Sequence, residues 1–247
     1  MTTYKILVGS YTDAIYTLEF DPAPSAGPPT LKYLTKVTVG DNPSWIEAHP
    51  SDRSLIFAGL EQAPDGQIVV VKYDKDGNGK KIEEATCSSG GADPCTLFVT
   101  EDELLIGNVS QVYRSRCARL VSLLFSFFLQ HCPTLAAMGD QQYSGGTLAT
   151  VPISTRPPYT RPAELWKFAF PFEAGKPGRN PSRQEVAHPH QTVFNPLNAT
   201  EKELLVPDLG SDRVWQLVKG SDGHWAIRSF IGAETGGGPR HIAFHGT

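Results

Sequence analysis

The chain has few cysteines and no long run of one charge. It has four cysteines among 247 residues, and no two of them form a C-x-x-C pair, which argues against a structural zinc or a thiol redox motif. Its 22 Lys and Arg against 26 Asp and Glu give a formal net charge of −4, and no basic block exceeds two residues. We therefore expect neither nucleic acid nor a membrane surface as its main partner.

Long apolar segments and common catalytic motifs are also missing. The most apolar stretch, 120–129, has ten residues, whereas a membrane-spanning helix needs about 20. The first 20 residues lack the basic and apolar segments of a signal peptide. No G-x-S-x-G, P-loop or G-x-G-x-x-G opening a helix is present, nor any cluster of metal ligands. We expect a cytoplasmic protein with free thiols, no metal and no cofactor.

Glycine and proline, with 23 and 20 residues, are abundant instead, and they punctuate a repeat. A unit of a proline, a short apolar strand and further alternating strands starts at Pro43, Pro94 and Pro189, and starts again, incompletely, at Pro239. The first two prolines lie 51 residues apart and the last two lie 50 apart. Short alternating strands at this period are typical of propeller blades. The sequence predicts an all-β fold, a β-propeller of four-stranded blades, with 225–231 closing one blade.

The interval between Pro94 and Pro189 breaks this period, because it is 95 residues long. Removing 109–142 shortens it to 61 residues and joins Asn108 to Tyr143 in a clean strand–turn–strand pattern. We predict that 109–142 is an insertion. One interpretation is a translated intron, since the codons at its two ends can carry intron boundary sequences. The other is an ordinary insertion with an amphipathic or partner-binding helix.

Several motifs resemble the lactonase family of seven-bladed β-propellers, which includes 6-phosphogluconolactonases and carboxy-cis,cis-muconate cyclases. The resemblance covers the chain except 109–142 and implies one propeller domain over 1–247, with about four of seven blades present. The motifs are 8–12, Asn108 joined to 143–147, 183–191, 206–213 and 237–241.

Compared with that family, the chain is expected to be incomplete. It opens on a strand that matches the second strand of a blade, and it ends on an expected first strand, 240–244. An alternative is that this last strand completes the first blade and closes a four-bladed ring.

One position of the repeat carries groups suited to lactone chemistry. The residue after each repeat proline is Ser44, Cys95, His190 or Arg240, and first strands line the channel of a propeller. An imidazole exchanges protons near neutral pH, and a guanidinium binds a carboxylate or phosphate with paired bonds. The resemblance implies that His190 and Arg240 are catalytic. It implies substrate-binding roles for residues in the same motifs: His188, Gln191, Asp208, Arg213 and His241.

The expected function is that of a lactonase acting on a small anionic sugar-acid lactone, or of a cyclase interconverting a muconate and its lactone. The resemblance also implies lowered activity, because further active-site residues of the family follow the G-P-R-H motif that ends at His241. The alternatives are a non-catalytic interaction propeller and structural roles for these residues. His190 could cap a strand, Arg240 could bridge two blades, and Asp208 with Arg213 could be an ordinary turn pair.

Overall fold

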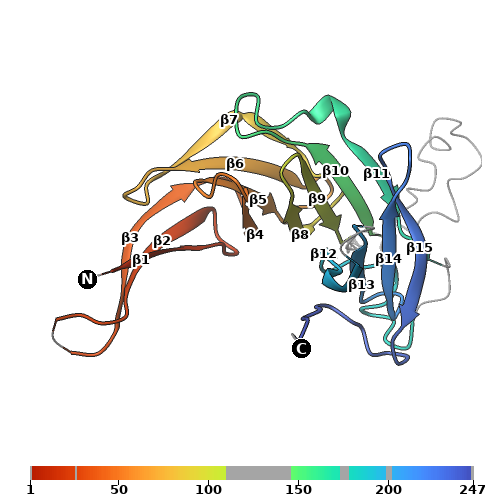
Figure 1. Ribbon diagram of the computed structural model, residues 1–247. Helices are drawn as coiled ribbons and strands as arrows, with labels where there is room; N and C mark the ends of the chain where they lie inside the picture. Colours follow the sequence, from red (N-terminus) through yellow and green to blue (C-terminus); the bar gives the residue numbers. More distant parts are fainter. Residues whose placement is uncertain (1, 26, 110–145, 173–177, 199–201, 246–247) are drawn as a thin grey trace, which may run out of the picture.

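The computed structural model describes residues 2–25, 27–109, 146–172, 178–198 and 202–245 (Figure 1). Nearly all elements in these ranges are β-strands, so the predicted all-β fold is confirmed. Except for Val109, the predicted insertion lies outside the described residues. The described helices are two short 3-10 turns, η2 (Pro162–Glu164) and η3 (Pro196–Asn198); neither has the length or apolar character needed to cross a membrane.

The described strands form four antiparallel sheets, in each of which every strand pairs with the next one along the chain. This up-and-down order is that of propeller blades. The first sheet contains β1 (Tyr4–Val8), β2 (Ala14–Asp21) and β3 (Thr30–Thr38). The second contains β4 (Pro43–Ala48), β5 (Leu55–Leu60), β6 (Gln67–Tyr73) and β7 (Gly79–Ser88). The third contains β8 (Pro94–Val99), β9 (Glu103–Asn108), β10 (Thr147–Pro152) and β11 (Trp166–Ala169). The fourth contains β12 (Val193–Phe194), β13 (Leu204–Asp208), β14 (Arg213–Lys219) and β15 (Trp225–Gly232).

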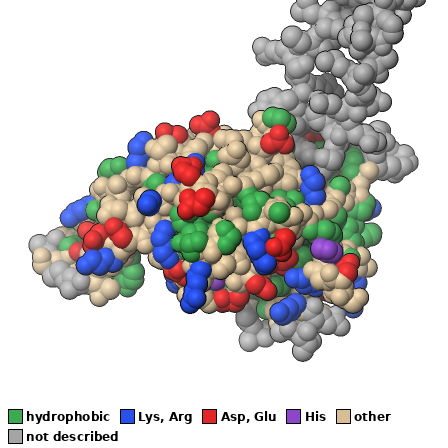
Figure 2. All heavy atoms as spheres, turned by 90° about the horizontal axis from the view of Figure 1, so that it is seen from above, with side chains coloured by type: hydrophobic (Ala, Val, Ile, Leu, Met, Phe, Trp, Pro, Cys, Tyr) green, Lys and Arg blue, Asp and Glu red, His purple; other side chains and the backbone are tan. Residues whose placement is uncertain are grey.

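The sheets follow one another along an open arc (Figure 1). The first sheet has three strands, and the C-terminal residues that the structure describes, up to residue 245, do not pair with it. The structure therefore contradicts the closed four-bladed ring. On the face seen in Figure 2, the described acidic and basic side chains are interspersed rather than gathered into fields of one sign.

Apolar side chains fill the space between neighbouring sheets. Phe57 and Val70 pack against Leu104 and Ile106 between the second and third sheets, and all four are fully buried. Similar clusters lie between the first and second sheets and between the third and fourth. Since burial of such a side chain stabilises the fold by about 1.5–3 kcal/mol, these clusters fix the sheets relative to one another.

Glycines within or directly after three equivalent strands set the distance between sheets. Each glycine lies against the carbonyl oxygen of the repeat proline at or before the first strand of the next sheet. A Cβ at Gly59 would lie only 3.1 Å from that oxygen, so a larger residue would push the sheets apart. This contact places β1 in the position of a second strand, as the sequence predicts. The pairs are Gly9 with Pro43, Gly59 with Pro94, and Gly107 with Pro189.

Two expected first strands differ from the prediction. Residues 240–244 form no strand, because no strand in the described ranges lies beside them to complete a hydrogen-bond ladder. The expected strand that begins at Pro189 is reduced to β12. His190 N donates to the Pro207 carbonyl at 2.9 Å, but Pro207 has no N–H to donate in return, so the ladder is interrupted there.

Candidate functional site

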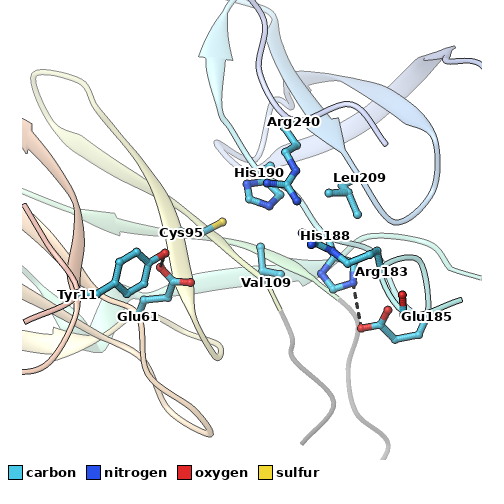
Figure 3. A pocket seen from close by; sticks show the side chains of 11 residues that line it. Tyr11, Glu61, Cys95, Val109, Arg183, Glu185, His188, His190, Leu209 and Arg240 are labelled. Atoms are coloured by element: carbon cyan, nitrogen blue, oxygen red, sulfur yellow. Dashed lines mark hydrogen bonds and ion pairs between the residues drawn. The ribbon is translucent and has the colours of Figure 1, made fainter. Parts of the chain in front are cut away.

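A cavity of about 480 Å³ lies where loops of all four sheets meet (Figure 3). Two positions of the repeat supply most of its wall. Among the residues that directly follow a repeat proline, Cys95, His190 and Arg240 line the cavity and Ser44 does not. The other described lining residues are Tyr11, Glu61, Val109, Ser182, Arg183, Glu185, His188 and Leu209.

A second repeat position also lines this wall and was not predicted from the sequence. This position lies two residues after each of the glycines that contact the next sheet, and in the fourth sheet two residues after Pro207. The residues at this position are Tyr11, Glu61, Val109 and Leu209. Because each glycine is held against the next sheet, the residue two places later reaches the cavity. The repeated glycine was therefore the signal that could have identified these residues.

His190 presents a neutral imidazole to the cavity. Burial is the largest cause that lowers its pKa, and together with the positive charge of Arg240 and the neighbouring His241 it brings the pKa to about 4. The His190 and His241 rings lie 6.1 Å apart, edge to face. At neutral pH the His190 ring can therefore accept a proton but carries no charge.

His188 lies on the same wall and faces Glu185. Its Nε2 is 3.3 Å from Glu185 Oε1 (Figure 3). Burial lowers the pKa of His188, although the Glu185 and Asp208 carboxylates oppose this shift. The backbone N–H of His188 donates to Asp208 Oδ1 at 2.6 Å, so Asp208 holds this part of the wall from behind.

Asp208 is fully buried and does not line the cavity. Its carboxylate also accepts from the N–H groups of Gly210 and Ser211, at 3.0 and 3.3 Å. The Ser211 hydroxyl donates at 2.6 Å and the Trp215 indole N–H at 2.9 Å. The carboxylate thus ties the turn after β13 to β14 and to the His188 backbone.

The remaining predicted binding residues also lie outside the cavity wall. Gln191 Oε1 accepts from the Ile242 N–H at 2.6 Å, which anchors the C-terminal segment beside His190. His241 lies next to His190 but is not a lining residue. The Arg213 guanidinium stacks on Trp215 and Phe230, 5.1 and 4.4 Å from their ring centres, and lines a different cavity. The structure therefore brings together His188, His190 and Arg240.

Cys95 carries a protonated thiol in this environment. Its thiol donates to the Pro189 carbonyl at 3.4 Å. Burial raises its pKa far above the ordinary value, and the Glu61 carboxylate acts in the same direction. Because the thiolate is the reactive form of cysteine, this protonated thiol serves as a small apolar part of the wall.

Comparison with known proteins shows similarity to lactonases. The model of the lactonase family, described as a 7-bladed beta-propeller, matches residues 5–114 and 139–247; the unmatched 115–138 lie within the predicted insertion. The probable 6-phosphogluconolactonase of Arthroderma benhamiae is 26% identical over 234 residues, which are 95% of this chain and 47% of that protein. The chain thus spans about half the length of this curated relative.

Two solved structures share the fold. A putative 6-phosphogluconolactonase from Bacteroides uniformis matches with a TM-score of 0.68 and 23% identity, over 99% of this chain and 59% of that one. The periplasmic gluconolactonase of Pseudomonas aeruginosa matches with a TM-score of 0.65 and 19% identity, over 98% and 59%. Because the family match covers well over half of the sequence and the strand order is that of propeller blades, the chain belongs to the lactonase family of seven-bladed β-propellers.

Proposed function

We propose that this protein hydrolyses a small anionic sugar-acid lactone, with 6-phosphogluconolactone as the first substrate to test. The observation that supports this most is that the neutral imidazole of His190 and the guanidinium of Arg240 line one cavity (Figure 3). The relatives named as 6-phosphogluconolactonases support the same reaction class. The predicted cytoplasmic location stays a prediction, as does the absence of a nucleic-acid partner.

The proposed reaction uses His190 first as a base and then as an acid. Its neutral ring accepts a proton from a water molecule as that water attacks the lactone carbonyl carbon. The tetrahedral oxyanion then collapses, the ring C–O bond breaks, and the departing alkoxide takes the proton from the imidazolium. The products are a carboxylic acid and a hydroxyl group, so one water is consumed. A low pKa makes the imidazolium a strong acid, which favours the second step.

Arg240 and Arg183 supply positive charge to the same cavity. A guanidinium can bind a phosphate or carboxylate of the substrate, or stabilise the developing oxyanion. His188, held by Asp208 and facing Glu185, completes this side of the wall. The predicted binding roles of Gln191, Asp208, Arg213 and His241 are then indirect, through the segments that these residues hold in place.

The direct test is the rate of 6-phosphogluconolactone loss with the purified 247-residue chain, corrected for spontaneous hydrolysis. Loss above the spontaneous rate supports the proposal. A chain that catalyses only the interconversion of carboxymuconate and its lactone would instead be a cyclase. A folded chain that accelerates neither reaction would contradict the proposal and favour the non-catalytic interaction propeller.

Replacing Arg240 with alanine is expected to lower kcat/KM for this lactone about 10- to 100-fold, because a charged hydrogen bond to the substrate is lost. Steady-state kinetics on the corrected rates measure this effect. Arg53→Ala is the matched control, since Arg53 is an exposed arginine in the turn between β4 and β5, away from the cavity wall. Equal losses in both variants would show that Arg240 has no specific role.

A further inference from the structure

The two sides of the cavity differ in charge. His188, His190 and the two arginines lie on the side formed by the C-terminal part of the chain, and Tyr11 with Glu61 lies across from them (Figure 3). Of the described lining residues, both arginines lie on the first side. A ligand that fills the cavity therefore meets guanidinium groups at one end, where the Glu185 carboxylate faces His188, and the Glu61 carboxylate at the other.

Glu61 is held by two hydrogen bonds to its backbone and one to its carboxylate. Its backbone N–H donates to the Asn42 carbonyl at 2.9 Å, and Asn42 Nδ2 donates to the Glu61 carbonyl at 3.2 Å. The Tyr11 hydroxyl donates to Glu61 Oε2 at 3.0 Å. Burial and the nearby Glu61 raise the pKa of Tyr11, so its hydroxyl stays protonated. The Glu61 carboxylate thus accepts from Tyr11, whose side chain is mostly exposed, and has further lone pairs for a ligand.

The Glu61 carboxylate can distinguish hydroxyl-rich lactones from lactones that carry a second carboxylate. Ionised carboxylates accept hydrogen bonds and donate none, so Glu61 can accept from the hydroxyl groups of a sugar acid. The oxygen of the Tyr11 hydroxyl can accept from a second one. A second carboxylate on the ligand would face Glu61 at close range and be repelled. Sugar-acid lactones carry several hydroxyls, whereas a carboxymuconate lactone carries two free carboxylates and no hydroxyl.

We propose that Glu61 and Tyr11 form a subsite for the hydroxyl groups of the ligand, opposite the arginines, and that this subsite selects polyhydroxylated ligands with a single anionic group over dicarboxylates. The inference rests on the proposed function for the class of ligand. It extends that function by assigning the orientation of the ligand and by favouring a sugar-acid lactone over a muconate lactone.

The test is the binding of two stable probes, gluconate and cis,cis-muconate, by isothermal titration calorimetry. The wild-type chain should bind gluconate more tightly than muconate. Glu61→Gln removes one charge with little change of size, and it should weaken gluconate binding about tenfold while strengthening muconate binding. Tyr11→Phe should weaken gluconate binding about threefold, because it removes one hydrogen-bonding group and leaves Glu61 less well oriented.

The matched control is Asp65→Asn, which removes one negative charge from the same loop between β5 and β6 at an exposed residue outside the cavity wall. It should leave the ratio of the two affinities unchanged. A Glu61→Gln variant with the wild-type melting temperature and the wild-type ratio would overturn the proposal. So would equal changes for the two probes.

Binding needs no turnover, so the two proposals fail separately. If the wild-type chain does not hydrolyse lactones but Glu61→Gln still shifts the affinity ratio, the proposed reaction is wrong and the subsite stands. If the chain is an active lactonase and the ratio does not respond to Glu61, the reaction stands and the subsite is wrong.

Discussion

Replacing Asp208 with alanine is expected to lower the free energy of unfolding by about 3–5 kcal/mol. The carboxylate is fully buried and accepts hydrogen bonds from three backbone N–H groups, the Ser211 hydroxyl and the Trp215 indole. Alanine leaves these donors buried without an acceptor, and each unsatisfied donor costs about 1–3 kcal/mol before relaxation or entry of water. Urea denaturation followed by circular dichroism measures the change.

Asp65→Ala is the control for this variant, because Asp65 is exposed and such surface changes alter stability by about 0.5 kcal/mol or less. Asp208→Asn should fall between wild type and alanine, since its amide oxygen keeps one acceptor while its NH₂ group faces the donors. If Asp208→Ala kept the wild-type stability and lost only affinity for the lactone, Asp208 would be a substrate-binding residue, as the sequence motif implied.

The blade architecture could be predicted because its signals are local. Proline fixes the backbone at the start of a strand, and strands with alternating apolar residues follow at a constant spacing. β4 and β8 begin at Pro43 and Pro94, as the repeat indicated. The same local signals are present in 240–244, yet no strand forms there. A strand also needs a neighbour with free N–H and C=O groups, and that condition cannot be read from the segment itself.

Three predicted residues line the cavity: His190 and Arg240, where chemistry and repeat position coincide, and His188, which lies in the same motif as His190. His190 and Arg240 stand at the same repeat position and carry reactive side chains, and both line the cavity. Tyr11 and Glu61 lie 50 residues apart in loops with no catalytic motif. They meet because Gly9 and Gly59 are each pressed against the next sheet. Asp208, by contrast, lies in a predicted motif but not in the cavity wall. The motif alone does not reveal that this carboxylate is hydrogen-bonded to the backbone around it.

Replacing His190 with glutamine is expected to lower kcat for the lactone about 10²- to 10⁴-fold, the range for loss of a general acid–base group. Glutamine keeps a polar side chain of similar size but cannot shuttle a proton at this pH. The control is His245→Gln, because His245 is exposed and lies outside the cavity wall. An unchanged kcat in His190→Gln would assign the imidazole a structural role, such as capping a strand.

The pH profile of the wild-type chain provides an independent check on His190. Because burial and Arg240 hold its pKa at about 4, the ring should stay neutral, and kcat/KM should stay level, as the pH falls from 7.5 to 5. Below about pH 4 the rate should fall tenfold per pH unit. A histidine with an ordinary pKa near 6.5 would instead lose most of the activity by pH 5.5.

Two further measurements separate this titration from acid unfolding. A folded-state pKa below the unfolded value means that protons bind the unfolded chain more strongly, so this group lowers stability as the pH falls from about 6.5 towards 4. Circular dichroism at each pH must therefore show a folded chain. In Arg240→Ala the repelling guanidinium is gone, so the pKa of His190 should rise and the acid limb of the residual activity should move to higher pH. An acid limb at the wild-type position in that variant would show that the charge of Arg240 does not lower the pKa of His190.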